Sequence, residues 1–290
     1  MLLAAVLWGS MGLFYKQLME VYGLPAITVV FFRAALSAVF MASFLVAAWK
    51  LRGVASPFAS VTRRDLAYFA LFGLTGLAGF YVVYINAIAQ VGVGVAAVLM
   101  YTAPAWVTAT SALLLGERLT GSKALALALA IAGAALVARA YRLEDLSLNA
   151  AGLLYGLGAG LGYGIYILFN KVAVRRHAPW TVLVFAWAFG ALFMLPFQSA
   201  EALAGAVTNP GALAWLLGVT LIATLASGVS FNLGLRDVPA SNASIVATIE
   251  PVVAMILGGL IYSERLDPPQ LLGGALILGA VILLTRRPGA

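Results

Sequence analysis

Apolar segments of about twenty residues follow one another along almost the whole chain, and one helix of that length crosses the hydrocarbon core of a bilayer. Of the 290 residues, 63% are hydrophobic and 9% are charged, with a mean hydropathy of +1.04. A soluble domain carries roughly 25% charged residues, so no water-soluble fold of this size could bury so much apolar surface. Runs such as LLGGALILGAVILL lack the alternation of a membrane β-barrel. We therefore predict an all-α polytopic membrane protein.

Ten segments are long enough to span a membrane, and short connections rich in Gly, Pro, Ser or Asp separate them. The predicted spans cover residues 1–18, 25–48, 66–88, 93–115, 123–140, 148–172, 181–198, 212–234, 241–262 and 270–285. The side that would hold both termini carries twelve Lys and Arg residues, whereas the opposite side carries four. Because positive residues favour the cytoplasmic side, the N-terminus and the C-terminus are both predicted to be cytoplasmic.

The motif Pro-x12-Glu-Arg-Leu occurs twice. Pro104 precedes Glu117, and Pro251 precedes Glu264, by 13 residues in each case. Both prolines remove a backbone donor within an apolar segment and should kink the fourth and ninth spans, either as hinges or for packing alone. Both glutamates are expected to end those helices in ion pairs with the arginine that follows each.

A second match lies near the start of each half, where Trp8 stands eight residues before Lys16 and Tyr163 stands eight before Lys171. The chain thus reads as two copies of one unit with five spans each. Because five is odd, the second copy inserts upside down and forms an inverted repeat about a pseudo-two-fold axis in the membrane plane. We place the first repeat at residues 1–142 and the second at residues 143–290. Such a chain can build the same gate twice, with opposite polarity.

These motifs resemble those of the drug/metabolite transporter superfamily and, within it, of the ten-helix EamA-type exporters. The positions that carry the resemblance are Trp8-Gly9-Ser10 with Lys16, Pro25 with Arg33, Pro104 to Leu119, Glu250 to Val253, Ser263 to Leu266, and Gly273, Gly274 and Gly279. The resemblance covers nearly all of the chain. It implies a secondary transporter in the inner (cytoplasmic) membrane of a bacterium that exports small metabolites, often amino acids, without ATP. The nearest match is an aromatic amino acid exporter.

Four charged side chains of the predicted spans are candidates for a role in transport, because a charge inside a span needs a partner or water. Lys16 and Lys171 stand near helix ends, where they either snorkel to headgroups or act in gating and in attracting a substrate carboxylate. Arg33 lies deeper, in the second span, and needs an acceptor. Glu250 lies near the centre of the ninth span and is either a structural carboxyl or a site for a coupled proton or a substrate ammonium. Whether Arg33 and Glu250 meet is left open by the sequence.

Aromatic and polar side chains concentrate in a few of the spans, where they could line a central cavity for alternating access. They are Trp8, Tyr81, Tyr84, Asn86, Tyr101, Tyr163, Tyr166, Asn170, Ser230 and Asn232. Asn86 and Asn232 are expected to avoid lipid, because an unpaired amide is costly there. Rings beside hydroxyls and amides suit a ring-bearing zwitterionic solute. Several of these tyrosines could instead belong to the interfacial aromatic belt.

Other functional classes find less support. The chain has no Cys, and its one His, His177, is expected to be a loop residue and not a metal ligand. Nucleotide-binding and hydrolase motifs are absent from the sequence, so we predict no cofactor, no metal and no catalytic residue. The net charge of +7 reflects loop residues and does not indicate nucleic acid. The alternatives are a carrier of phosphorylated or nucleotide-linked sugars, a channel and an intramembrane enzyme. The expected partners are a small-molecule substrate and the lipid bilayer, with a monomer as the default.

Overall fold

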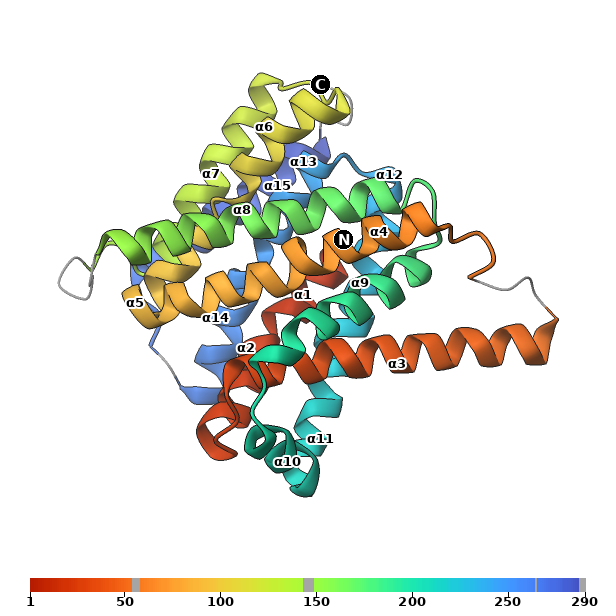
Figure 1. Ribbon diagram of the computed structural model, residues 1–290. Helices are drawn as coiled ribbons and strands as arrows, with labels where there is room; N and C mark the ends of the chain where they lie inside the picture. The colour runs from red at the N-terminus through yellow and green to blue at the C-terminus, as the bar shows by residue number, and fades with distance from the viewer. Residues whose placement is uncertain (54–57, 143–148, 264, 287–290) are drawn as a thin grey trace.

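The chain folds into an all-α bundle (Figure 1), and the structure, a computed structural model, describes residues 1–53, 58–142, 149–263 and 265–286. The first five spans are α1 (Leu2–Gly9) with α2 (Met11–Lys16) and the π-helical turn Gln17–Val21; α3 (Ala26–Arg52); α4 (Arg63–Phe72) with the π-helical segment Gly73–Gly79 and the first part of α5 (Phe80–Met100); the rest of α5 with α6 (Ala103–Leu115); and α7 (Gly121–Val137).

The last five spans follow after residues 143–148. They are α8 (Ala150–Ala173); α9 (Pro179–Met194) with the 3-10 turn Leu195–Phe197; α11 (Pro210–Gly218) with the π-helical segment Val219–Ala226 and α12 (Ser227–Asp237); α13 (Ala240–Ala247) with α14 (Ile249–Tyr262); and α15 (Pro268–Arg286). The short helix α10 (Ala200–Thr208) lies in the connection before the eighth span.

The number of membrane spans, ten, follows from the lengths of the apolar helices and from a break in one of them at a glycine. Among the described residues, eight helical stretches are long and apolar enough to cross a bilayer. One of them, residues 63–100, breaks at Gly92, whose φ of 77° and ψ of 164° are accessible to glycine. Gly92 therefore separates the third span from the fourth, which α6 completes. The apolar helix α7 has 17 residues and forms the fifth span.

The two halves repeat the same backbone irregularities at a constant offset of about 147 positions. Each half has a π-helical segment in its third span, at 73–79 and 219–226. Each has an interruption before its proline motif, at Tyr101 and at Thr248. Each ends the following helix on a left-handed residue, Gly116 with φ of 68° or Ser263 with φ of 55°. This pattern confirms the ten-helix inverted repeat, because independent helices would not break at matching places.

A helix contact is repeated as well. Gly9 of α1 lies against the backbone carbonyl of Glu250 in α14, and a Cβ at Gly9 would collide there. Gly164 of α8 lies against the carbonyl of Ala103 in α6. At Gly9 the absence of a side chain lets two backbones approach closely, as is typical of helix packing in membranes, whereas a Cβ at Gly164 would make ordinary van der Waals contacts. The two contacts nevertheless join matching positions of the halves.

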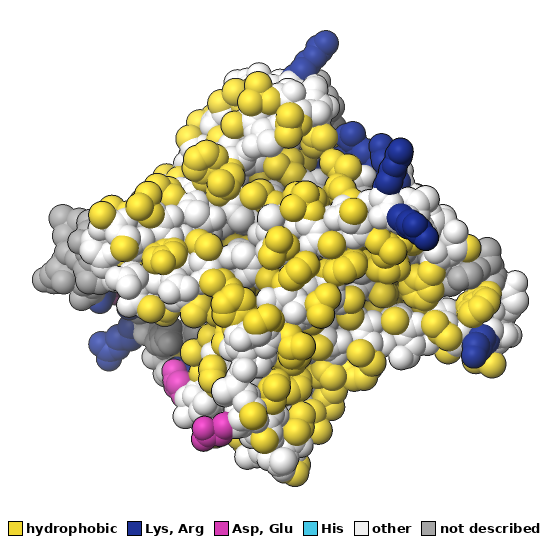
Figure 2. Space-filling view, viewed as in Figure 1, with side chains coloured by type: hydrophobic (Ala, Val, Ile, Leu, Met, Phe, Trp, Pro, Cys, Tyr) yellow, Lys and Arg dark blue, Asp and Glu magenta, His cyan; other side chains and the backbone are white. Residues whose placement is uncertain are grey.

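Two pairs of matching helices contact each other, namely α3 with α9 and α7 with α15. In the second pair, Gly133 and Gly273 each lie against the other's backbone carbonyl. Figure 2 shows hydrophobic side chains over the middle of one face and charged side chains near its margins. Leu113, Leu154 and Leu260 are 84%, 73% and 76% exposed, as expected for side chains in contact with lipid.

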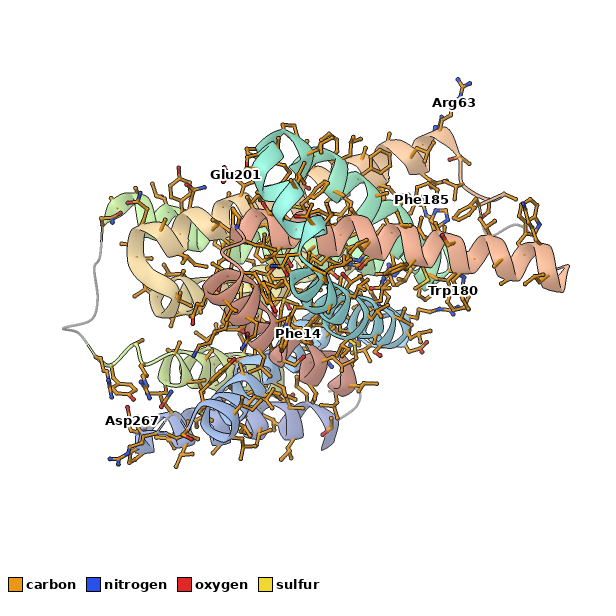
Figure 3. The ribbon with its side chains drawn as sticks, turned by 90° about the horizontal axis from the view of Figure 1, so that it is seen from below. Phe14, Arg63, Trp180, Phe185, Glu201 and Asp267 are labelled. Atoms are coloured by element: carbon orange, nitrogen blue, oxygen red, sulfur yellow. The ribbon has the colours of Figure 1, made fainter. Side chains whose placement is uncertain are left out.

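Charged groups occupy opposite ends of the bundle. Figure 3 places Arg63, at the start of α4, far from Asp267, just before α15. The protein is an integral membrane protein. The cytoplasmic placement of the Arg63 end continues to rest on the distribution of Lys and Arg. The repeat boundary between residues 142 and 143 remains a prediction, since residues 143–148 lie outside the described part of the chain.

Candidate functional site

Arg33 of α3 lies buried near the centre of the bundle, with 2% of its surface exposed. Its guanidinium donates to the Tyr81 hydroxyl, to Met11 Sδ at 2.6 Å and to the Tyr15 hydroxyl at 3.5 Å. It also lies 5.0 Å from the ring centroid of Tyr81 and 5.5 Å from that of Trp187, within range of a cation–π interaction. Its Nε has no hydrogen-bond partner among the described residues. One donor is therefore not committed to the protein.

Glu250 lies in the first turn of α14, and its side chain keeps part of its surface accessible. Its carboxyl interacts electrostatically with Arg33. No Arg33 nitrogen lies within 4.0 Å of a Glu250 oxygen in the described structure. The two charged residues of the deep spans thus share one region without forming a direct ion pair. Four tyrosines lie within electrostatic range of the same carboxyl: Tyr81, Tyr84, Tyr101 and Tyr163.

A continuous run of aromatic rings connects five of the ten predicted cavity residues. Trp8 contacts Phe231, with 4.9 Å between centroids, and Phe231 stacks on Tyr166 at 6.4 Å. Tyr166 stacks on Tyr163 at 6.2 Å, and Tyr163 stacks on Phe80 at 5.6 Å. The run then continues from Phe80 to Tyr81 and to Tyr84. It crosses α1, α12, α8 and α5, so rings of both halves form one wall.

Three further predicted residues are buried close to this wall. Tyr101 is 6% exposed and belongs to the same hydrophobic cluster as Phe80. Asn170 is 1% exposed and donates to the carbonyl of Tyr166 at 3.0 Å. Asn232 is fully buried, and neither polar atom of its amide has a partner among the described residues. The expectation that Asn232 avoids lipid therefore agrees with its burial.

Asn86 and Ser230 are placed differently from the prediction. Asn86 is exposed, near the exposed Ala89 and Gln90, and its amide donates to the carbonyl of Val82 at 2.8 Å. That bond within the helix removes the cost of an unpaired amide, which was the reason to expect Asn86 inside. Ser230 likewise donates to the carbonyl of Ala226 in its own helix, at 2.7 Å. The structure does not join either side chain to the aromatic wall.

Pro104 and Pro251 do not kink continuous helices. Each stands in the first turn of a new helix, α6 or α14, just after the interruption at Tyr101-Thr102 or Thr248. A proline is tolerated there because the first-turn nitrogens have no partner within the helix. The interruption leaves the ring of Tyr101 and the carboxyl of Glu250 beside the centre. Whether the breaks act as hinges remains a prediction.

Lys16 and Lys171 make different contacts, although they occupy matching positions. The ammonium of Lys16 lies 3.7 Å from the ring centroid of Tyr262 at the end of α14. The ammonium of Lys171 donates to the backbone carbonyls of Leu235, Arg236 and Val238, and Lys171 is 5% exposed. Lys171 therefore does not snorkel to headgroups in this structure, because its three donors are occupied inside the protein.

Glu117 corrects the expectation of an interfacial ion pair. Its carboxylate accepts hydrogen bonds from the backbone nitrogens of Ala240 and Ser241, at 2.7 and 3.1 Å, and from the Ser241 hydroxyl. It thus caps the N-terminus of α13, where unpaired N–H groups and the helix dipole favour an anion. The matching Glu264 lies outside the described residues.

His177 contributes to structure at one end of the bundle. Its Nε2 lies 3.1 Å from Asp65 Oδ1. Its ring packs on Phe69, with 5.4 Å between centroids. Groups of three or more His, Cys, Asp and Glu that could hold a metal are not found among the described residues.

Sequence reasoning missed four residues of the centre: Tyr15, Phe80, Trp187 and Phe231. Phe80 and Phe231 look like ordinary core residues in the sequence, yet they link the predicted tyrosines and Trp8 into one wall. Trp187 carried a signal, because it matches Arg33 when the second spans of the halves are aligned on Pro25 and Pro179. Matching positions of an inverted repeat that lie on the axis contact each other, and Arg33 and Trp187 do so.

Comparison with known proteins shows which family this chain resembles in sequence and fold. The model of the EamA-like transporter family matches residues 1–139 and 150–286. An uncharacterized transporter of Archaeoglobus fulgidus is 31% identical over 98% of this chain and 94% of its own length. The protein named probable terminal-alkyne amino-acid exporter of Streptantibioticus cattleyicolor is 28% identical over 77% of this chain and 74% of its own. A solved crystal structure, 18% identical, has a TM-score of 0.80 and covers 99% of this chain and 96% of its own, which shows the shared fold.

Proposed function

Because this chain belongs to the EamA-like transporter family, whose members are transporters of small molecules and not enzymes, we propose that it exports amino acids. Amino acids with aromatic side chains are the favoured solutes. Export proceeds across the cytoplasmic membrane by alternating access around the cluster formed by Arg33, Glu250 and the aromatic wall. The driving force is a solute or proton gradient, since the sequence lacks a nucleotide-binding motif.

The observation that carries this proposal is that Arg33 and Glu250 lie in the same aromatic-lined region but do not form a direct ion pair. A zwitterion presents a carboxylate to a guanidinium and an ammonium to a carboxylate, so Arg33 and Glu250 would each gain an oppositely charged partner when it binds. A ring on the same solute can pack on Tyr84 or Tyr163. Pockets for small molecules combine apolar walls with a few placed polar groups in this way.

The contacts of the two lysines favour an amino acid over a phosphorylated sugar. A phosphate group carries more negative charge than a carboxylate and is usually held by several cations. Here Lys171 is committed to backbone carbonyls and Lys16 to the ring of Tyr262. Arg33 is then the cation that remains at the centre among the described residues. A relative at 28% identity carries the name of an amino-acid exporter, which agrees with this choice.

Counterflow into proteoliposomes tests the proposal. Vesicles that contain purified protein and unlabelled phenylalanine should take up external radiolabelled phenylalanine or tryptophan faster than empty vesicles do. Trp8→Ala and Tyr84→Ala should each lower that uptake by roughly tenfold, since each removes a ring from the wall. Stimulation by solute on the opposite side also separates a carrier from a channel, which would not show it.

Trp106→Ala is the matched control. Trp106 is 39% exposed on α6, so its truncation should leave uptake unchanged. Failure to transport any amino acid at any pH gradient would contradict the proposed solute class and would favour phosphorylated or cationic solutes.

A further inference from the structure

The turn between α12 and α13 is held from both sides by charged side chains of other spans. Lys171 of α8 donates to the carbonyls of Leu235 and Arg236 at the end of α12, at 2.7 and 3.2 Å, and to that of Val238 in the turn, at 2.8 Å. Glu117, which follows α6, accepts from the first backbone nitrogens after the turn, those of Ala240 and Ser241.

Each charge matches the helix end that it caps. A helix C-terminus presents unpaired carbonyls and a negative dipole end, so it favours an ammonium. A helix N-terminus presents unpaired N–H groups and a positive dipole end, so it favours a carboxylate. Lys171 and Glu117 also interact electrostatically with each other. The cluster of Lys171, Glu117 and residues 235–241, called here the latch, therefore joins the fourth, sixth, eighth and ninth spans.

The repeat supplies a matching lysine and a matching turn at the opposite end, but these two are apart in this structure. The positions matching residues 235–241 are 88–94, and Lys16 matches Lys171. Lys16 lies on the ring of Tyr262 instead. Helices α12 and α13 both pack on α8, whereas α5 does not pack comparably on α1 or α2 among the described residues. Figure 1 likewise shows α6, α8, α12 and α13 converging at one end and α5 standing apart from α2 at the other.

The halves also differ in whether an aromatic ring is available to the lysine that is not part of a latch. Tyr262 holds the ammonium of Lys16 by a cation–π contact. The position matching Tyr262 is Leu115, which offers no aromatic ring. A released Lys171 would therefore lose three charge-assisted hydrogen bonds without gaining such a site.

We propose that Lys171 and Glu117 lock the end predicted to be cytoplasmic, and that Lys16 locks the opposite end in the alternate state by capping the carbonyls of residues 88–91. The two lysines then act as positioning residues with opposite effects on one equilibrium. Lys171 stabilises the state seen here, and Lys16 stabilises its counterpart. The missing ring at Leu115 biases the resting protein toward the state seen here. The inference rests on the alternating-access part of the proposed function and not on the identity of the solute.

Distances between spin labels test the proposal without any solute. The chain has no cysteine, so paired cysteines can be introduced without removing native ones. A Leu119→Cys and Arg236→Cys pair reports on the latched end, and a Val21→Cys and Val93→Cys pair reports on the other. All four positions are exposed. Lys171→Met should lengthen the first distance and shorten the second, and should change the population ratio by roughly tenfold, as expected for the loss of a charge-assisted hydrogen bond.

Lys16→Met is the matched variant, and it should leave the state seen here populated or raise its share. Tyr262→Leu frees Lys16 and should shift the populations in the same direction as Lys171→Met, which provides a second test if Lys171→Met does not fold. Unchanged distances in a folded Lys171→Met protein, or the same shift from both lysine variants, would overturn the proposal. Absence of amino-acid transport would contradict the proposed solute and leave these distance changes as expected.

Discussion

At the two ends of the bundle the halves keep a matching lysine and a matching glutamate, whereas the charged residues at its centre are not repeated. Lys16 matches Lys171, and Glu117 matches Glu264. At the centre, Arg33 stands opposite Trp187, and the position matching Glu250 is Ala103. The residues near the gates thus occur twice, and the two central charges occur once.

The difference follows from what each region has to do. A gate must close on each side in turn, so an inverted repeat can use one design at both ends. The proposed solute, an amino acid, has no two-fold axis of its own. A symmetric site would present two identical groups to the two unlike ends of such a solute. The loss of symmetry at Arg33 and Glu250 is therefore what the proposed zwitterionic solute would require.

The largest expected effect comes from making the centre symmetric. Arg33→Trp places the residue of the second half in the first and removes the buried cation. We expect counterflow of phenylalanine to fall by roughly a hundredfold, because charge-assisted hydrogen bonds to a carboxylate contribute about 1.5–3 kcal/mol each. Trp187→Phe keeps a ring beside Arg33 and is the control, with a change of less than about threefold. Equal losses in both variants would show that packing matters there and charge does not.

A smaller loss is expected at the acidic partner. Glu250→Gln keeps the shape of the side chain but removes the charge that would bind a substrate ammonium. Counterflow should fall by roughly tenfold, mainly through a higher KM. Glu201→Gln serves as the control and should behave like the unmodified protein, because Glu201, labelled in Figure 3, is exposed on α10. Wild-type KM in Glu250→Gln would remove Glu250 from the binding site and leave proton coupling or a structural role for its carboxyl.

The aromatic wall offers a finer comparison, because Tyr84 and Phe231 occupy matching positions. Tyr84→Phe makes the two alike and removes one hydroxyl while the ring stays. Counterflow should change by about twofold to fivefold, compared with roughly tenfold for Tyr84→Ala. A loss as large in Tyr84→Phe as in Tyr84→Ala would mean that the hydroxyl, and not the ring, binds the solute.

The smallest effect on transport is expected at the outer ends of α7 and α15. Asp267 pairs with Arg142 at 2.6 Å and Arg139 at 3.6 Å, and accepts a hydrogen bond from the Tyr141 hydroxyl at 2.9 Å. The matching residue of the first half, Thr120, caps α7 through its hydroxyl without a charge. Asp267→Thr should leave counterflow unchanged and lower the thermal unfolding temperature slightly at neutral pH.

The pH dependence of that loss follows from the same contacts. The hydrogen bond from Tyr141 and the nearby Arg142 and Arg139 hold the pKa of Asp267 below its ordinary value of 3.8. Near pH 4 the folded state therefore binds fewer protons than the unfolded state does. The stabilisation is complete above that pH and is lost as the pH falls through the lowered pKa. Thermal unfolding of both proteins in detergent from about pH 7 downward should show the difference shrink once the pH falls below about 4. A difference that does not change with pH would point to packing.

The prediction of Asn86 shows where sequence reasoning reached its limit. Hydropathy placed Asn86 in the third span, and the free-energy cost of an unpaired amide in lipid predicted that its side chain would face away from lipid. Its position on the exposed side depends on the rotation of that helix, which follows the π-helical segment Gly73–Gly79. The extra residue of a π-helical turn changes which face of the following helix contacts a neighbouring helix. No local sequence motif predicted this π-helical turn. Tyr81 and Tyr84, on the same helix, do reach the centre.

The sequence by itself determined the membrane class, the ten spans and the two matching halves, because hydropathy and residue spacing are local properties that survive without contacts. It also identified most of the central residues, since polar and charged groups in lipid are costly enough to stand out. Tertiary structure alone decided which groups meet. Lys171 and Glu117 cap a turn more than sixty positions away along the chain, and Arg33 lies between Tyr81 and Trp187. Such partners depend on how helices rotate and pack. A buried charge needs a hydrogen-bonding partner, and the arrangement of the neighbouring helices decides which group that partner is.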